Sequence, residues 1–142
     1  MHDYIRKVNY YETDKMGITH HSNYIRWMEE ARTDFLERNG CGYQKFEADG
    51  IVSPVISVEC RYKHSTTFDD RVKICIEVEK YTGVSLTFRY IMTNADTGVV
   101  VATGKSSHCF VDQSGAPIIV KKRYPELDAT FKSLVPQKAT SV

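Results

Sequence analysis

The side chains best suited to chemistry gather between residues 13 and 24. Asp14 can act as a general base or as a nucleophile, and His20, His21 and Ser22 follow it closely. The stretch leads from a predicted strand into a predicted helix. It therefore forms a loop held by regular structure on both sides, which is where catalytic and binding residues concentrate.

A helix that begins near Ser22 would add a second chemical group to this loop. The first N–H groups of a helix have no partner inside it, and the helix dipole places positive charge at the same end. Such donors can stabilise an oxyanion, and each is worth about 3–4 kcal/mol of activation barrier in well-studied enzymes. Asp14 precedes this helix start closely enough to act on a carbonyl group bound there.

Simpler interpretations of the same residues remain open. Local chemistry alone favours Asp14 as a turn-forming residue, because Thr-Asp before a glycine-containing loop is common turn chemistry. His20 and His21 are typical of a solvated or helix-capping pair. Two adjacent histidines do not easily chelate one metal ion and no third ligand is apparent, so no metal site is predicted. A triad of Asp14, His21 and Ser22 is disfavoured, because sequence neighbours rarely align in that way.

One long amphipathic helix is predicted over residues 22–39. Ser22 is expected to cap its start, and Gly40 is expected to end it in a left-handed turn. Charged residues, Arg32 among them, mostly fill one face. Apolar residues recur on the other face at three- and four-residue spacings: Tyr24, Trp27, Met28, Ala31, Phe35 and Leu36.

Strands are predicted on both sides of this helix. Period-two alternation predicts strands with one buried face, and the turn residues between them favour antiparallel pairing. The economical arrangement is an α+β fold in which a curved antiparallel sheet of about five strands wraps around one long central helix. The predicted strands cover residues 4–12, 55–63, 72–79, 84–92 and 99–111, with short helices at 43–49 and 124–134.

Length and composition are those of an ordinary soluble protein. The chain has 142 residues, which suggests a single domain over 1–142. A net charge of +1 gives no general attraction to nucleic acid. No apolar run approaches a membrane span, no signal-peptide pattern opens the chain, and the four cysteines form no C-x-x-C pair. A cytoplasmic protein with reduced thiols is expected.

The loop and the helix resemble a known family. Residues 11–24 (YETDKMGITHHSNY) are similar to the signature of the 4-hydroxybenzoyl-CoA thioesterase family of hotdog-fold proteins. Residues 27–32 (WMEEAR) extend the similarity into the central helix, and Phe68-Asp69-Asp70 resembles a second, weaker landmark. The similarity spans nearly the whole chain in order and length.

The resemblance implies hydrolysis of acyl-CoA thioesters without a metal or organic cofactor. It implies that Asp14 is the catalytic carboxylate, either as nucleophile or as general base on water, and that the backbone N–H of His21 is the oxyanion donor. It also implies an active site between two protomers, hence a homodimer or a dimer-of-dimers tetramer. The substrate-binding residues it implies are Gly17, Ile18, Asn23 and Tyr24. The CoA nucleotide has three candidate cations outside the family pattern: Lys63, Arg61 and Lys80.

Two features depart from the family pattern. Ser65-Thr66 stands where many members have Pro-Ala, and the turn at residues 80–83 carries one cation where some members have a basic cluster. A hotdog enoyl-CoA hydratase is disfavoured, because those enzymes have a tighter Asp–His motif with Asn-Pro. A non-catalytic acyl-CoA-binding protein is the other alternative, although a binder has no need of Asp14.

Overall fold

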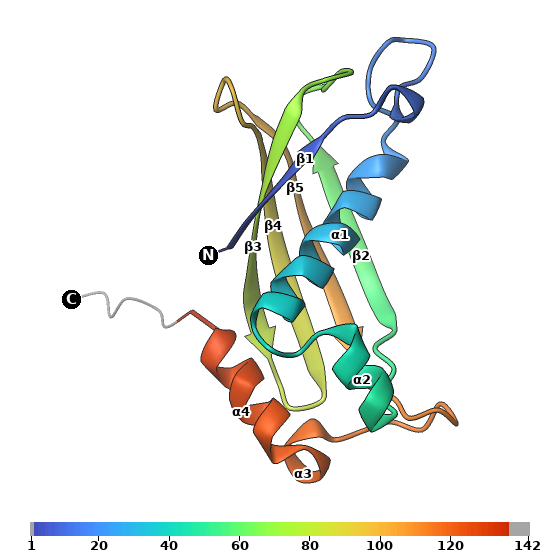
Figure 1. Cartoon of the computed structure of the whole chain (residues 1–142), viewed down its shortest axis with the longest axis vertical. Coiled ribbons are helices and arrows are strands. Elements are labelled where there is room, and N and C mark those ends of the chain that lie inside the picture. The colour runs from blue at the N-terminus through green and yellow to red at the C-terminus, as the bar shows by residue number, and fades with distance from the viewer. Residues whose placement is uncertain (1, 137–142) are drawn as a thin grey trace, which may run out of the picture.

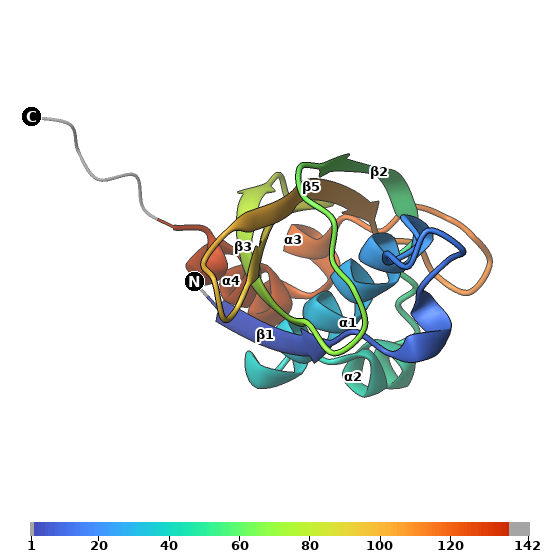
Figure 2. The same cartoon turned by 90° about the horizontal axis from the view of Figure 1, so that it is seen from above.

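The fold is a five-stranded antiparallel sheet curved around one long helix. The computed structural model describes residues 2–136, and the strand order in the sheet is β1-β3-β4-β5-β2. The α+β architecture predicted from the sequence is confirmed (Figures 1 and 2). The elements are β1 (His2–Lys7), the 3-10 helix η1 (Tyr10–Glu12), α1 (Ser22–Arg38), α2 (Tyr43–Asp49), β2 (Val55–Tyr62), β3 (Arg71–Tyr81), β4 (Ser85–Asn94), β5 (Val100–Cys109), α3 (Val120–Arg123) and α4 (Pro125–Leu134).

The first strand ends earlier than the sequence predicts. The predicted strand covers residues 4–12, but β1 stops at Lys7 and Tyr10–Glu12 form the 3-10 helix η1. The Glu12 carboxylate turns back and accepts the backbone N–H of Asn9 at 2.8 Å, which stabilises the tight turn. Tyr10 and Tyr11 are left exposed, so their apolar character does not report a buried strand face.

The central helix α1 carries the predicted apolar stripe into the core. Trp27, Met28 and Ala31 are fully buried against the sheet, and Gly40 adopts the expected left-handed conformation with φ of 74° just past the helix end. The prediction of Ser22 as the cap is wrong. His21 precedes the helix without a side-chain cap, and Ser22 is its first residue.

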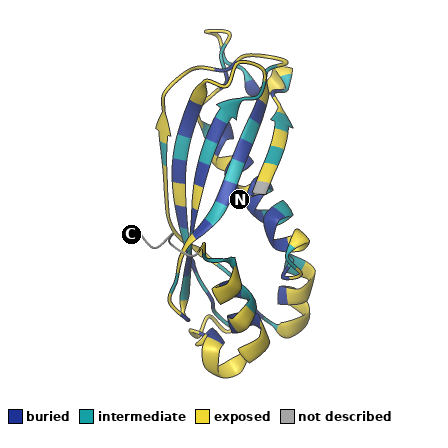
Figure 3. Ribbon diagram, turned by 90° about the vertical axis from the view of Figure 1, so that its left-hand side faces the viewer, coloured by how far each residue is buried: buried dark blue, intermediate teal, exposed yellow. Residues whose placement is uncertain are grey.

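Strands β3 and β4 alternate between the core and the outside as predicted (Figure 3). Strand β2 does not. It lies at the edge of the sheet, and Val55, Ile56, Val58 and Tyr62 are all more than 40% exposed. The prediction that this strand buries one face is therefore wrong for the single chain. β2 is an edge strand, and its contact with α1, such as that of Tyr62 with Tyr24, leaves the inner row of side chains partly exposed.

The C-terminal helices close the lower end of the sheet. Phe131 of α4 is fully buried and stacks on Phe110 with ring centroids 5.4 Å apart. The Tyr81 hydroxyl on β3 donates to the Asp128 carboxylate of α4 at 2.6 Å. In the described part of the chain, no helix is long and apolar enough to cross a membrane, and the four cysteines are free.

Candidate active site

The loop from Thr13 to Thr19 is a tight hairpin that ends next to the start of α1. Thr13 and Thr19 form an antiparallel bridge. Inside it, the Asp14 N–H donates to the Ile18 carbonyl and the Gly17 N–H donates to the Asp14 carbonyl, both at 2.9 Å. Gly17 has a φ of 79°, a conformation that favours glycine, so the sequence can close the loop without strain.

Thr66 fixes this hairpin to the sheet and to the helix. Its carbonyl accepts the Thr19 N–H at 2.8 Å, and its hydroxyl lies 2.6 Å from the Thr19 hydroxyl. The Tyr24 hydroxyl of α1 lies 2.9 Å from the same Thr66 hydroxyl. All three residues are buried. Thr66 is therefore a hydrogen-bonding centre in this chain, at a position where many proteins with this signature have alanine.

Glu12 holds the other end of the loop. Its carbonyl accepts the His20 N–H at 2.8 Å and the Asn23 side-chain amide at 3.0 Å. Its carboxylate is buried and accepts bonds from Arg6 and from the Trp27 indole. Burial alone would raise the pKa of Glu12, but the hydrogen bonds from Arg6, the Asn9 backbone and Trp27 outweigh it and hold that pKa below its ordinary value.

Asp14 combines a turn-forming role with a free oxygen. Its Oδ1 accepts the Met16 N–H at 2.8 Å, which is the turn chemistry that its local sequence suggests. Among the described residues, the second carboxylate oxygen has no hydrogen-bond partner. The side chain is partly exposed and lines a cavity. One oxygen thus fixes the orientation of the carboxylate while the other is available to a water molecule or a substrate.

The helix start offers a free donor to the same cavity. The Asn23 and Tyr24 N–H groups bond to the carbonyls of His20 and His21, and the Ser22 N–H lies 3.3 Å from the His20 ring. Within residues 2–136 the His21 N–H has no acceptor. It lies at the positive end of the 17-residue helix α1, so it suits an incoming oxyanion.

These groups meet in one cavity of about 490 Å³. Five of the predicted site residues line it: Asp14, Ile18, His21, Tyr24 and Lys63. Gly17 and Asn23 lie outside the lining, where Gly17 shapes the turn and Asn23 is buried beneath the loop. The lining also includes residues that were not predicted to belong to the site: Met16, Thr19, Tyr62, His64 and Ser65.

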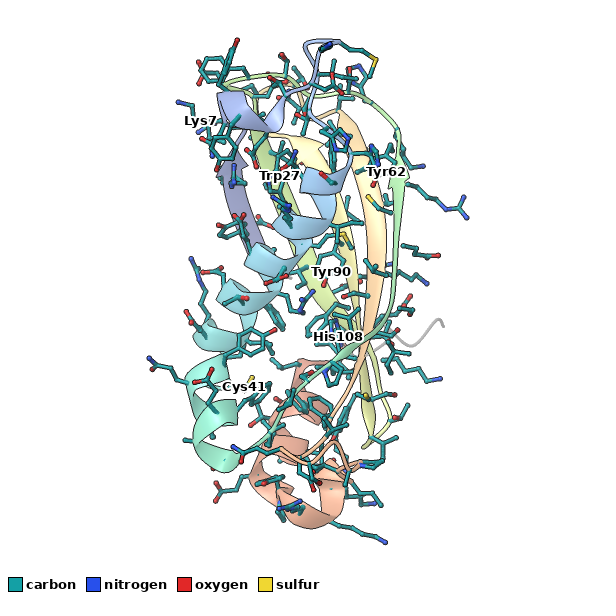
Figure 4. The ribbon with its side chains drawn as sticks, turned by 90° about the vertical axis from the view of Figure 1, so that its right-hand side faces the viewer. Lys7, Trp27, Cys41, Tyr62, Tyr90 and His108 are labelled. Carbon is teal, nitrogen blue, oxygen red and sulfur yellow. The ribbon has the colours of Figure 1, made fainter. Side chains whose placement is uncertain are left out.

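Tyr62 is the most informative of the residues that the sequence analysis missed. It stands at the end of β2 and faces α1 (Figure 4), and its hydroxyl donates to the His21 carbonyl at 3.1 Å. Its ring packs edge-on against Tyr24 at 5.3 Å. Burial, together with neighbouring Cys60, raises the pKa of Tyr62 to about 12, so the phenol stays protonated and keeps this bond. The sequence feature that could have indicated Tyr62 is its position at the end of a strand with alternating residues.

Metal-ligand geometry does not occur at this site. The His20 and His21 rings lie 4.3 Å apart, and His20 bonds to the Ser22 hydroxyl at 2.8 Å. In the part of the chain that the structure describes, no group of three or more His, Cys, Asp or Glu side chains is placed to hold a metal ion.

Comparison with known proteins assigns the chain to a family. The model of the thioesterase-like superfamily matches residues 8–135. The chain belongs to this superfamily. A proposed esterase of Aquifex aeolicus is 36% identical over 124 residues, which are 87% of this chain and 94% of that protein. The proposed acyl-CoA thioesterase YneP of Bacillus subtilis is 32% identical over 127 residues, 89% of this chain and 91% of that protein.

A solved structure supports the same assignment for this member of the superfamily. The DHNA-CoA thioesterase of Staphylococcus aureus has a TM-score of 0.87 and 30% identity, covering 92% of this chain and 88% of that one. The superfamily member described here is therefore a thioester hydrolase with the hotdog fold, as the resemblance of residues 11–24 predicted.

Proposed function

We propose that this thioester hydrolase acts on acyl-CoA, with Asp14 as the catalytic carboxylate and the His21 N–H as the oxyanion donor. The observation that carries the proposal is the shared cavity: a carboxylate with a free oxygen and a helix-start amide without an acceptor both border it. Relatives named for acyl-CoA and DHNA-CoA thioester hydrolysis support the substrate class.

Two chemical routes use the same groups. In one, Asp14 takes a proton from water, the resulting hydroxide attacks the thioester carbon, and the tetrahedral intermediate expels the CoA thiolate, which receives the proton. In the other, Asp14 attacks the carbon itself, the CoA thiolate leaves, and water hydrolyses the resulting anhydride. In both, negative charge develops on the carbonyl oxygen, where the His21 N–H and the dipole of α1 stabilise it.

The other predicted site residues are assigned to substrate binding or to holding the loop. Ile18 and Tyr24 would contact the acyl side of the thioester, and Gly17 and Asn23 would keep the loop in place. Lys63 is exposed at the rim, where its ammonium can bind a phosphate of the CoA nucleotide. A lysine acts there as a point charge without a required geometry.

We also propose that the active protein is a homodimer joined through β2. This strand lies at the sheet edge and exposes apolar side chains, a combination that favours pairing with a second strand. Tyr62, Lys63, His64 and Ser65 at its end line the cavity, so a second copy paired there would border the active site.

Asp14→Asn tests the proposed function directly. The asparagine keeps an oxygen for the Met16 N–H, so the turn survives while the base or nucleophile is lost. We expect kcat for thiol release, assayed over a panel of acyl-CoA substrates, to fall by about 100-fold or more. Thermal unfolding of the variant should match that of the parent protein.

Asp112→Asn is the matched control. Asp112 Oδ1 accepts the Ser114 N–H at 2.8 Å, which is the same turn chemistry as at Asp14 but away from the cavity. We expect this variant to keep full activity. Unchanged turnover in Asp14→Asn would refute the assigned role. Tight binding of acyl-CoA without turnover of any substrate would instead favour a binding protein.

A further inference from the structure

A positively charged side chain is buried in the middle of the fold without a counter-charge. Arg32, predicted on the polar face of α1, is only 7% exposed. Its Nη1 donates to the Tyr90 hydroxyl at 3.2 Å, and its buried Nε has no hydrogen-bond partner. Within residues 2–136 no carboxylate forms a salt bridge with Arg32.

The neighbours of Arg32 are polar but neutral, and they include the hydroxyl groups of Tyr90 and Tyr43. The Tyr90 hydroxyl lies 2.6 Å from the Ser106 hydroxyl, which lies 2.8 Å from His108 Nε2. Arginine can only donate, so the Tyr90 hydroxyl accepts from Arg32. Every hydroxyl then has an acceptor if Tyr90 donates to Ser106 and Ser106 donates to an unprotonated His108 Nε2. Burial and the charge of Arg32 lower the pKa of His108 to about 4, which keeps the imidazole neutral. The guanidinium charge is therefore uncompensated, an arrangement that strongly disfavours burial.

A seam between α1 and β2 leads from the catalytic cavity to this charge. Tyr24, Met28 and Arg32 lie four residues apart on α1, and Tyr62, Cys60 and Val58 lie two residues apart on the inner side of β2. Four helical residues advance about 6 Å and two strand residues about 6.6 Å, so the two rows stay level with each other. Tyr90 and His108, labelled in Figure 4, come from β4 and β5, the two strands next to β2 in the sheet.

Three contacts show which residues of α1 and β2 lie at the same height along the seam. At the mouth, the Tyr24 and Tyr62 rings touch. In the middle, Met28 packs on Gly104, where an added Cβ would lie 2.8 Å from the Met28 Cε, and Gly104 pairs with Cys60. At the far level, Ser106 of the Arg32 network pairs with Val58.

The cavity lining ends at Tyr24 and Tyr62, and beyond them the seam is filled by the fully buried Met28, which a chain-like ligand would have to displace. Val58 is 42% exposed and Tyr62 47% exposed, so the β2 side is not sealed by the chain itself. Met28 occupies the middle, and methionine is unbranched and readily changes rotamer. From Tyr24 to Arg32 the helix advances about 12 Å.

We propose that Arg32 forms the far end of the acyl-binding site and binds a carboxylate at the end of the acyl group, so that the preferred substrates are acyl-CoA thioesters of dicarboxylic acids. The inference rests on the proposed acyl-CoA thioesterase function. A terminal carboxylate supplies both the missing negative charge and an acceptor for the unpaired Nε. Tyr90 is a positioning residue, since its hydroxyl holds the guanidinium.

Binding of two non-hydrolysable thioethers tests the inference independently of catalysis. One is the thioether analogue of suberyl-CoA, which ends in a carboxylate, and the other is that of octanoyl-CoA, which ends in a methyl group. By isothermal titration calorimetry we expect the wild-type protein to bind the carboxylate-ended analogue roughly 10- to 100-fold more tightly. Arg32→Met should reduce this ratio to about one, and Arg32→Lys and Tyr90→Phe should give intermediate ratios.

Arg38→Gln is the matched control, because Arg38 is an exposed arginine of the same helix and should leave the ratio at the wild-type value. Equal affinity of the wild-type protein for both analogues, including no binding of either, would overturn the inference even if Arg32→Met failed to fold. A preference that persists in folded Arg32→Met would overturn it as well. Hydrolysis that depends on Asp14 but shows no carboxylate preference would refute this inference and leave the proposed function standing.

Discussion

The Trp27 indole N–H donates to the buried Glu12 carboxylate at 3.0 Å. This bond joins the second turn of the central helix to the residue two positions before Asp14. Arg6 of β1 adds two charge-assisted bonds to the same carboxylate, at 2.6 and 3.0 Å. The sheet, the helix and the loop that carries Asp14 are thus joined at one carboxylate, so substitution of Glu12 tests how this loop is held in place.

Glu12→Gln should destabilise the protein by about 2–3 kcal/mol, because it removes a buried negative charge while leaving Arg6 largely buried beside it. The measurement is the free energy of unfolding from urea denaturation at neutral pH. Activity should also fall, because weaker side-chain anchoring of residue 12 would loosen its backbone carbonyl, which holds His20 and Asn23.

Glu30→Gln is the control for this change. Glu30 also bonds to Arg6, at 3.0 Å, but its side chain is 35% exposed, so its loss should cost less than about 1 kcal/mol. Equal losses in the two variants would mean that burial does not distinguish the two carboxylates.

The regular elements of this fold could be predicted because their sequence periods report burial. Strands β3 and β4 bury every second residue, and α1 buries a stripe of side chains. The predicted ranges 72–79, 84–92 and 22–39 therefore lie close to the observed β3, β4 and α1. The loop chemistry was partly predictable too. Local rules identified Asp14 as a turn residue, which it is, and the helix start as a source of a free N–H.

The features that were missed depend on partners far away in the chain. Arg32 looked like a surface residue because arginine usually is one, and its partner Tyr90 lies 58 positions away. The predicted strand at 4–12 ended early because the Glu12 carboxylate is drawn inward by Arg6 and Trp27. The exposure of β2 follows from its place at the sheet edge, which alternation alone does not reveal.

The exposed edge of β2 leads to a prediction about assembly. Wild-type protein should behave in analytical ultracentrifugation as a dimer of 16.3 kDa chains. Ile56→Lys, at a position that is 58% exposed, should shift it to the monomer, because an edge lysine opposes strand pairing.

Ile119→Lys is the matched control for assembly. Ile119 is also an exposed isoleucine, at 45%, but it lies before α3 and away from the edge strand, so this variant should stay dimeric. A monomeric wild-type protein, or a dimer that survives Ile56→Lys unchanged, would contradict pairing through β2.

The buried imidazole of His108 should make stability depend on pH in a defined window. Burial and the nearby Arg32 charge lower its pKa to about 4 from an ordinary value of 6.5. Between these values the unfolded chain binds a proton that the folded chain does not. The free energy of unfolding should therefore fall as the pH drops from about 6.5 toward about 4, by up to about 3 kcal/mol.

His108→Gln should remove this dependence, because a glutamine oxygen can still accept the Ser106 hydroxyl bond but does not titrate. The measurement is urea denaturation at about pH 7 and about pH 5, where the wild type should lose about 2 kcal/mol and the variant much less. The pKa of Glu12 lies below its ordinary value of 4.5, so its contribution to stability is lost mainly below about pH 4.5 and adds little between pH 7 and pH 5. His64→Gln, at an exposed histidine, should retain the wild-type slope. An unchanged slope in His108→Gln would show that the imidazole is not held neutral by the Arg32 network.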